Sequence, residues 1–230
     1  MSYSIRIGHI YHDLLNMYGD KGNIAAMKKR LLWRNIDCSI TEIKSGETFS
    51  PADYDIILLG GGSDKAEASA LKSLMNFKEN IRDYIENGGV FLAVCGGYPM
   101  LGKYISDGSE KRDCLGILDI YTENKPARFT GNTVLYTDFC ETVVGFENHF
   151  GKTFTGEYKP LGKKSTGESE GIVYKNLFAT YLHGPLLPKN PLLTDEIIKR
   201  SLAQKYGEEI TLAPLDDTLE NEAHTYLLNL

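Results

Sequence analysis

The sequence predicts an α/β fold: a doubly wound, mostly parallel sheet with helices on both faces and some antiparallel edge strands. The first observation is that apolar runs alternate with helical segments over the first hundred residues. Strands of a parallel sheet that are covered on both faces have this near-continuous apolar character. The second observation is that glycine-rich turns follow two of these runs directly, as expected where parallel strands end at the carboxyl edge of such a sheet.

The first half of the chain supplies the central elements in order. A turn-rich stretch, residues 11–23, precedes the first predicted helix (about 23–34). The second predicted helix (about 66–87) is the longer of the two. Four segments have the character of strands of this sheet: 4–10, 38–43, 53–62 and 88–94. Two segments between them have helical character: about 23–34 and about 66–87.

The second half has a different texture. Beyond residue 113, short strands are broken by Gly, Asn and Thr, which indicates mixed or antiparallel strands at one edge of the sheet. The segment 172–188 carries two more strands, and 191–207 has the pattern of an amphipathic helix that ends at a glycine. We therefore expect a single domain over residues 1–230, with a C-terminal tail of helical character from about residue 208.

Composition excludes several classes of function. Hydrophobic residues make up 42% and charged residues 24% of the chain, a globular balance, and the formal net charge of -6 argues against nucleic acid as a partner. No apolar run approaches the ~20 residues that span a bilayer, and the N-terminus does not resemble a signal peptide, so we expect a cytoplasmic protein. The four cysteines lack the spacing of metal ligands, which predicts free thiols and no metal site.

One cysteine stands in an unusual context. In GGVFLAVCGGYPMLG, residues 88–102, the apolar strand stops at Cys95 and two glycines follow. This pattern indicates a sharp strand-to-helix turn with the geometry of a nucleophile elbow, with Cys in place of Ser. A helix over 97–106 would begin behind the sulfur and lower the thiol pKa from about 8.5. The backbone N–H of Gly96 is then free to bind an oxyanion.

A nucleophilic thiol also needs a base and a second oxyanion donor. The glycine triplet 60–62 ends a neighbouring strand, so the N–H of Gly61 or Gly62 can supply the donor. His183 ends the apolar run ATYLH before Gly-Pro and is the first candidate for the base; His149 is the second. Each feature alone is more often structural, whereas their combination favours catalysis. No phosphate-binding pattern supports a nucleotide site.

These motifs carry a resemblance. The segments DIILLGGG, VFLAVCGGYPMLG, GFENH and YLHGP resemble the class I (triad-type) glutamine amidotransferases, in the branch shared with the glutaminase domains of cobyric and cobyrinic acid synthases. The resemblance implies hydrolysis of L-glutamine to glutamate and ammonia through a γ-glutamyl thioester. It assigns Cys95 as nucleophile and His183 as base, and the amides of Gly61 or Gly62 and of Gly96 as the oxyanion hole.

The resemblance also implies substrate contacts and a partner. Arg128 would hold the glutamine α-carboxylate, and Tyr98 of the elbow would contact the substrate. Many members carry a Glu two residues after the base, but His183 is followed by Gly-Pro. We therefore expect a Cys–His dyad in this chain, with an acid from a partner to orient the histidine.

The segment NMYGDKGN, residues 16–23, resembles the stand-alone glutaminase subunits of lipid II isoglutaminyl synthases. This implies a heterodimer with a Mur-ligase-like synthetase subunit that uses ATP and Mg and amidates the D-glutamate α-carboxyl of the peptidoglycan stem peptide. No cofactor is expected in this chain. Three alternatives stay open: a glutaminase subunit of a cobyrinate-type amidotransferase, a cysteine hydrolase on the same sheet, and a non-catalytic binding module.

Overall fold

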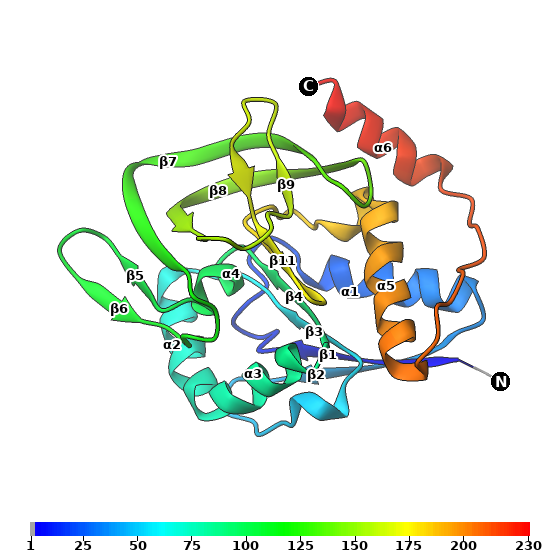
Figure 1. The fold of residues 1–230 in the computed structure, drawn as a ribbon, viewed down its shortest axis with the longest axis horizontal. Helices are drawn as coiled ribbons and strands as arrows, with labels where there is room; N and C mark the ends of the chain where they lie inside the picture. Colours follow the sequence, from blue (N-terminus) through cyan, green and yellow to red (C-terminus); the bar gives the residue numbers. More distant parts are fainter. Residues whose placement is uncertain (1–2) are drawn as a thin grey trace.

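The central sheet has six strands. The computed structural model describes residues 3–230 (Figure 1), and the strand order is β11-β12-β4-β3-β1-β2. All neighbours pair in parallel except β11 and β12, which are antiparallel. This confirms the predicted fold class. The strands are β1 (Ser4–Ile10), β2 (Asp37–Ile43), β3 (Ile56–Leu59), β4 (Val90–Val94), β11 (Ile172–Tyr174) and β12 (Leu177–Thr180).

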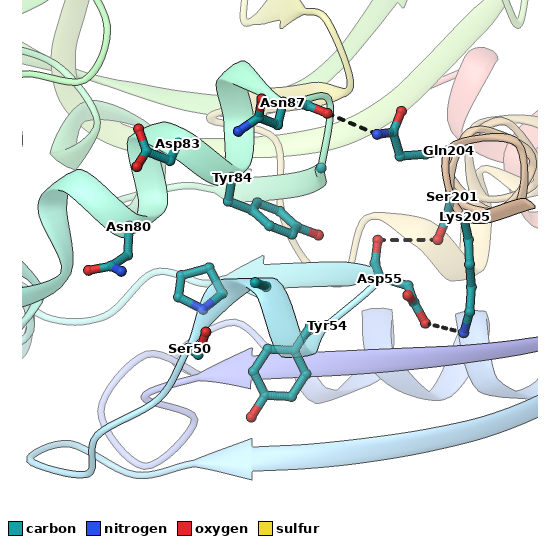
Figure 2. A pocket seen from close by; sticks show the side chains of 13 residues that line it. Ser50, Tyr54, Asp55, Asn80, Asp83, Tyr84, Asn87, Ser201, Gln204 and Lys205 are labelled. Carbon is teal, nitrogen blue, oxygen red and sulfur yellow. Dashed lines mark hydrogen bonds and ion pairs between the residues drawn. The ribbon is translucent and has the colours of Figure 1, made fainter. Parts of the chain in front are cut away.

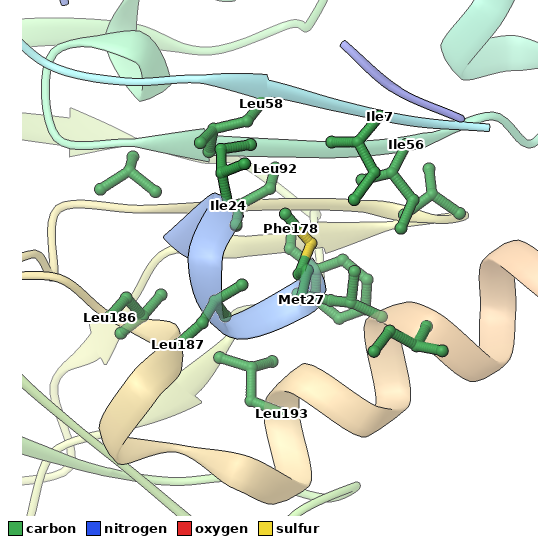
Figure 3. Close-up of a cluster of buried hydrophobic side chains, with 14 of the residues drawn as sticks. Ile7, Ile24, Met27, Ile56, Leu58, Leu92, Phe178, Leu186, Leu187 and Leu193 are labelled. Carbon is green, nitrogen blue, oxygen red and sulfur yellow. The ribbon is translucent and has the colours of Figure 1, made fainter. Parts of the chain in front are cut away.

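Helices cover both faces of this sheet. Buried side chains of α1 (Lys21–Trp33) and α5 (Pro191–Tyr206) pack on one face, where Figure 3 shows Ile24, Met27 and Leu193 against strand residues. On the other face, α2 (Asp64–Leu74) and α3 (Lys78–Glu86) bury their apolar side chains. Burial of apolar surface on both faces explains why the inner strands β3, β4 and β12 are buried at every position and show no polar alternation.

Local signals fix where these helices begin and end. The side chain of Ser63 accepts a hydrogen bond from the N–H of Ala66 and so caps α2. Pro191 occupies the first turn of α5, and Gly207 ends that helix at a φ of 72°. The predicted helix over 66–87 is two helices, because the 3₁₀ turn η2 (Met75–Phe77) separates α2 from α3.

The strands between residues 104 and 170 form a second sheet, where we had expected edge strands of the first one; within residues 3–230, only β11 is an antiparallel edge strand of the first sheet. Its order is β10-β9-β7-β5-β6, with β8 paired to β7. The long β7–β8 hairpin lies over the end of the central sheet next to α4 (Gly97–Met100) in Figure 1. The strands are β5 (Tyr104–Ser106), β6 (Lys111–Asp113), β7 (Tyr121–Tyr136), β8 (Thr142–Phe154), β9 (Gly162–Lys163) and β10 (Ser169–Glu170).

The remaining elements are short or terminal. The predicted helix over 97–106 is wrong in length, because α4 ends at Met100 and the chain continues into β5. The tail is helical as predicted: α6 (Thr218–Leu228) is held by His224, whose ring bonds with Thr142 Oγ1 and the carbonyl of Lys189, each at 2.8 Å. The 3₁₀ turns η1 (Pro51–Asp53) and η3 (Leu187–Lys189) complete the fold. Within residues 3–230, the helices are too short or too polar to cross a bilayer.

Candidate active site

The turn after β4 has the conformation of a nucleophile elbow. Cys95 has a φ of 53°, a left-handed value that is uncommon for a residue with a side chain. Its N–H donates a hydrogen bond of 2.8 Å to the carbonyl of Thr180, the last residue of β12. The strained residue is thus held by the neighbouring strand, with the thiol at the carboxyl edge of the sheet.

Glycines let the elbow and the loop after β3 come close together. A Cβ on Gly61 would lie 2.7 Å from the Cβ of Cys95, and one on Gly97 would lie 2.5 Å from the carbonyl oxygen of Leu59. Neither position can carry a side chain without moving backbone. The predicted proximity of the 60–62 triplet to Cys95 is therefore confirmed, and it explains why positions 61 and 97 are glycine.

A cavity of about 330 Å³ opens above the thiol. Acidic side chains from the start of α2 and basic side chains from the second sheet face it from different directions. Residues that line it include Cys95, Gly96, Glu67, Arg112, Arg128 and His149. A cavity of this size with carboxylates and guanidinium groups suits a small zwitterion such as an amino acid.

The predicted acidic thiol is not what the structure contains. Burial and, to a smaller extent, the nearby carboxylate of Glu67 together raise the pKa of Cys95 to about 12, against a hydrogen bond from the N–H of Gly96. With only four residues, α4 has a weak dipole to oppose these effects. Formation of the thiolate therefore requires a base or a rearrangement of charge around the sulfur.

The amides proposed as oxyanion donors are engaged by side chains. The N–H of Gly61 donates to Asp20 Oδ2 and that of Gly62 to Glu67 Oε1, each at 3.2 Å. Asp20 is 2% exposed, and burial raises its pKa to about 7 against the hydrogen bonds from Gly61 and Asn23. For these amides to bind an oxyanion, the carboxylates must release them; the oxyanion roles of Gly61, Gly62 and Gly96 stay predictions.

His183 lies at the same edge of the sheet as Cys95. It follows β12, and its backbone exchanges hydrogen bonds with Phe146 of β8. The side chain is 1% exposed, and within residues 3–230 neither ring nitrogen has a hydrogen-bond partner. Burial lowers the pKa of His183 to about 4, with smaller contributions from His149 and Lys189. The imidazole is neutral at pH 7 and can accept a proton.

The other candidate base is less suitable. His149 lines the cavity, but its Nδ1 lies 2.8 Å from the carbonyl of Gly151 and its Nε2 lies 3.3 Å from Glu147. Both ring nitrogens face acceptors, so neither is free to take a proton from the thiol. His149 is therefore less suited to the role of base. His183 is not among the residues that line the cavity above Cys95, and its role as the base stays a prediction.

The two predicted substrate-binding residues differ in position. Arg128 lines the cavity, where Nη1 donates to Asn148 Oδ1 at 2.5 Å and the guanidinium lies 4.5 Å from the ring centroid of Phe150. Tyr98 is 1% exposed and lines a separate cavity of about 150 Å³. This placement argues against direct contact between Tyr98 and a substrate at Cys95.

Sequence reasoning missed three residues of the site: Tyr18, Asp20 and Glu67. Tyr18 and Asp20 belong to the NMYGDKGN segment, which was used only for its resemblance. Glu67 lies in the first turn of α2, which follows the glycine triplet 60–62. This position was the only signal in the sequence that its carboxylate would lie next to the thiol.

A larger cavity of about 450 Å³ lies at the opposite edge of the sheet, where β3 and β4 begin. In Figure 2 its polar groups bind one another: Lys205 pairs with Asp55 at 2.8 Å, and Gln204 donates to the carbonyl of Asn87 at 2.8 Å. These contacts join α5 to the residues beside β3 and α3 and so stabilise the packing of α5 on the sheet.

A cysteine on a strained elbow, a neutral histidine at the same edge and a doubly wound sheet define the class I glutamine amidotransferases. Residues 6–191 match the CobB/CobQ-like glutamine amidotransferase domain, and the chain belongs to this family. It is a glutamine amidotransferase, an enzyme that takes nitrogen from glutamine.

Two relatives are similar over nearly their whole length. The lipid II isoglutaminyl synthase (glutamine-hydrolyzing) subunit GatD of Staphylococcus aureus (strain N315) is 40% identical, covering 99% of this chain and 96% of that protein. The protein of the same name from Streptococcus pneumoniae (strain ATCC BAA-255 / R6) is 38% identical, covering 96% and 89%. A cobyric acid synthase of Vibrio campbellii is 34% identical, but the match covers 65% of this chain and 33% of that protein.

Solved structures support the fold. A crystal structure of a glutamine amidotransferase has a TM-score of 0.59 at 16% identity, covering 85% of this chain and 98% of the other. A glutamine amidotransferase from Thermotoga maritima has a TM-score of 0.56 at 16% identity, covering 98% and 94%. At this level of identity, the likeness shows the common fold.

Proposed function

We propose that this chain is the glutaminase subunit of a lipid II isoglutaminyl synthase. The observation that carries the proposal is the similarity to the two GatD subunits, which extends over nearly the whole of each chain. The match to cobyric acid synthase spans only a third of that protein, so the alternative of a cobyrinate-type glutaminase subunit has weaker support.

In the proposed reaction, His183 takes the thiol proton and Cys95 Sγ attacks the side-chain carbonyl of L-glutamine. The tetrahedral oxyanion is stabilised by backbone N–H groups at Gly96 and at the 61–62 loop. Its collapse breaks the C–N bond, and ammonia leaves with the proton held by His183. Water then hydrolyses the thioester to glutamate and restores the thiol, so that one glutamine and one water give glutamate and ammonia.

The ammonia passes to a Mur-ligase-like subunit, which activates the D-glutamate α-carboxyl of the lipid II stem peptide with ATP and Mg. The two subunits form a heterodimer in the cytoplasm. A partner-supplied acid that completes the triad fits the free ring nitrogens of His183, because no carboxylate among residues 3–230 hydrogen-bonds to that imidazole. Without it, the chain alone has a less fixed imidazole and weak glutaminase activity.

The proposal is tested by incubating the purified chain with the synthetase subunit, lipid II, ATP, Mg and L-glutamine. We expect amidated lipid II, detected by mass spectrometry, and co-purification of the two subunits. Cys95→Ala should abolish amidation with glutamine, whereas added ammonium at alkaline pH should restore it. Glutamine hydrolysis without lipid II amidation, together with amidation of a corrinoid by a cobyrinate-type partner, would assign the chain to the alternative.

A further inference from the structure

An aromatic side chain covers the proposed base. The ring of Tyr18 stacks on the imidazole of His183 with 3.8 Å between centroids and 14° between planes. The edge of Phe146 approaches the same imidazole at 5.8 Å and 62°. These two rings are in contact with the imidazole, whose nitrogens have no hydrogen-bond partner within residues 3–230.

We infer that Tyr18 positions the His183 imidazole for proton transfer by holding the plane of the ring, and so leaves its nitrogens to the thiol proton and to the acid that the partner is proposed to supply. A ring stacked at this distance fixes the plane of the imidazole. The face of a tyrosine also attracts a cation, so the same stack stabilises the imidazolium that forms when His183 takes the thiol proton. The inference rests on the proposed glutaminase function and on Cys95 and His183 as its dyad.

The hydroxyl of Tyr18 extends this contact to the substrate site. Asn148 Nδ2 donates to Tyr18 Oη at 2.8 Å, while Asn148 Oδ1 accepts from Arg128 Nη1 at 2.5 Å. Because a guanidinium can only donate, the Asn148 amide must present its oxygen to Arg128 and its nitrogen to Tyr18. One amide therefore links the residue proposed to bind the glutamine α-carboxylate with the residue that stacks on the base.

The segment that carries Tyr18 is fixed on both sides. The N–H of Met17 donates to the carbonyl of Gly61 at 3.2 Å, and Asn23 Oδ1 accepts from the N–H of Leu187 at 2.8 Å. A Cβ on Gly22 would lie 2.5 Å from Pro185 Cγ, in the loop that follows the base. Tyr18 therefore stands on a backbone anchored to the glycine loop and to the chain beyond His183, as positioning requires.

The two parts of the Tyr18 side chain should have separable effects on glutaminase kinetics. In Tyr18→Phe the ring remains, so kcat should stay within about 3-fold of the wild type, because Phe offers the same stacking face. Loss of the hydroxyl frees Asn148 and Arg128, so KM for L-glutamine should rise by about 3-fold to 10-fold. In Tyr18→Leu, KM should match that of the Phe variant, while kcat falls by about 10-fold to 100-fold because the base is no longer held.

The experiment measures glutamate release from L-glutamine by the full chain with the synthetase subunit present. Tyr18→Met serves as a second variant without a ring, in case Tyr18→Leu does not fold, and thermal unfolding reports the folding of each. Tyr3→Leu is the matched control: it removes a ring from the edge contact of 4.9 Å with Tyr206, where β1 begins, and should leave kcat and KM unchanged.

Two results would overturn the inference while the proposed function stands. One is a folded Leu or Met variant with the kcat of the wild type. The other is a Phe variant that loses as much kcat as the Leu variant, which would mean that the stacked ring does not hold the base. Failure of wild-type protein to release glutamate in a Cys95-dependent manner would instead overturn the proposed function, and this inference with it.

Discussion

The backbone N–H of Cys95 donates a hydrogen bond of 2.8 Å to the carbonyl oxygen of Thr180. This bond continues the parallel pairing of β4 with β12, in which Val94 stands opposite Thr180. Because β12 ends just before His183, the register of the two strands brings the thiol and the imidazole out at one edge of the sheet. Backbone pairing therefore sets the relative position of Cys95 and His183, the two residues of the predicted dyad.

The first prediction concerns this dyad. A glutamine-like electrophile should modify Cys95 selectively, and Cys95→Ala should abolish both the labelling and the release of glutamate. His183→Ala should retain glutamine binding but lose turnover by about 100-fold or more, since the thiol then lacks a general base. Mass spectrometry of labelled peptides and a glutaminase assay are the measurements. Labelling spread evenly over all four cysteines would contradict the role of Cys95.

The second prediction concerns the charge beside the thiol. Glu67→Gln keeps an acceptor for the N–H of Gly62 but removes the negative charge that raises the pKa of Cys95. The pKa of Cys95 should fall, so alkylation by iodoacetamide should speed up between pH 7 and 9, where the thiolate fraction limits the rate.

Cys140 provides the internal control for this measurement. Its pKa is raised to about 11 by burial, with weaker effects from Glu196 and Glu141, so its alkylation should not respond to a change at residue 67. An exposed substitution, Glu79→Gln on α3, should leave both thiols unchanged. Equal rates at Cys95 in Glu67→Gln and in the wild type would show that Glu67 does not control its acidity.

The fold could be predicted where local pattern determines structure. The apolar runs at β3 and β4 and the glycine that ends α5 follow from burial and from backbone freedom, and both appear in the sequence. The sequence did not show that the later strands form a sheet of their own and are not edge strands of the central sheet. Which strands pair, as β7 does with β8, depends on contacts between distant residues. The length of α4 was overestimated because the chain turns away at Gly102, which lies against Ile120, and this contact is tertiary.

The site shows the same division. Cys95, Gly96 and Gly97 could be recognised in the sequence because a nucleophile elbow requires backbone angles and close contacts that few residue types other than glycine allow. The acidity of the thiol was predicted with the wrong sign, because Glu67 and burial raise its pKa and neither is visible next to residue 95 in the sequence. Tyr18 was missed for the same reason, since its stacking on His183 joins distant segments.

The third prediction concerns substrate affinity. Arg128→Leu should raise KM for L-glutamine by about 10-fold to 100-fold, because a hydrogen-bonded charge contact contributes about 1.5–3 kcal/mol. The value of kcat should change much less, since the contact proposed for Arg128 is with the α-carboxylate and the reacting carbonyl is at the other end of the substrate. Steady-state kinetics on the full chain give both constants. Lys125→Leu, which breaks the surface pair of Lys125 with Glu123 at 2.7 Å, is the control and should leave KM unchanged.

The fourth prediction concerns the attachment of the tail. Arg30 is 3% exposed and binds Asp195 of α5 and Asp217, the residue before α6, with contacts of 2.6 and 2.5 Å. Arg30→Met leaves Asp217 without its buried partner, so the free energy of unfolding should fall by about 3 kcal/mol. Urea titration measures this loss, and limited proteolysis should show faster cleavage between residues 208 and 217.

An exposed ion pair provides the comparison for Arg30. Lys199 lies 3.6 Å from Glu209, with 42% and 85% of the two side chains exposed. Lys199→Met should change the free energy of unfolding by less than about 0.5 kcal/mol, because water screens such pairs. If Arg30→Met were as stable as Lys199→Met, the cluster around Arg30 would not hold the tail.

The last prediction concerns acid stability. His9 is fully buried, neither of its ring nitrogens has a hydrogen-bond partner within residues 3–230, and burial lowers its pKa to about 4, with His12 as the next cause. The folded-state pKa lies below the unfolded value of about 6.5, so the unfolded chain binds more protons between these values and stability falls as pH drops from 6.5 to 4. His9→Leu removes this linkage, so the variant should gain up to about 3 kcal/mol relative to the wild type over that interval. Urea unfolding at pH 7, 5.5 and 4.5 measures the difference, with His9→Gln as a polar comparison. A constant difference between variant and wild type at all three pH values would show that His9 does not titrate on unfolding.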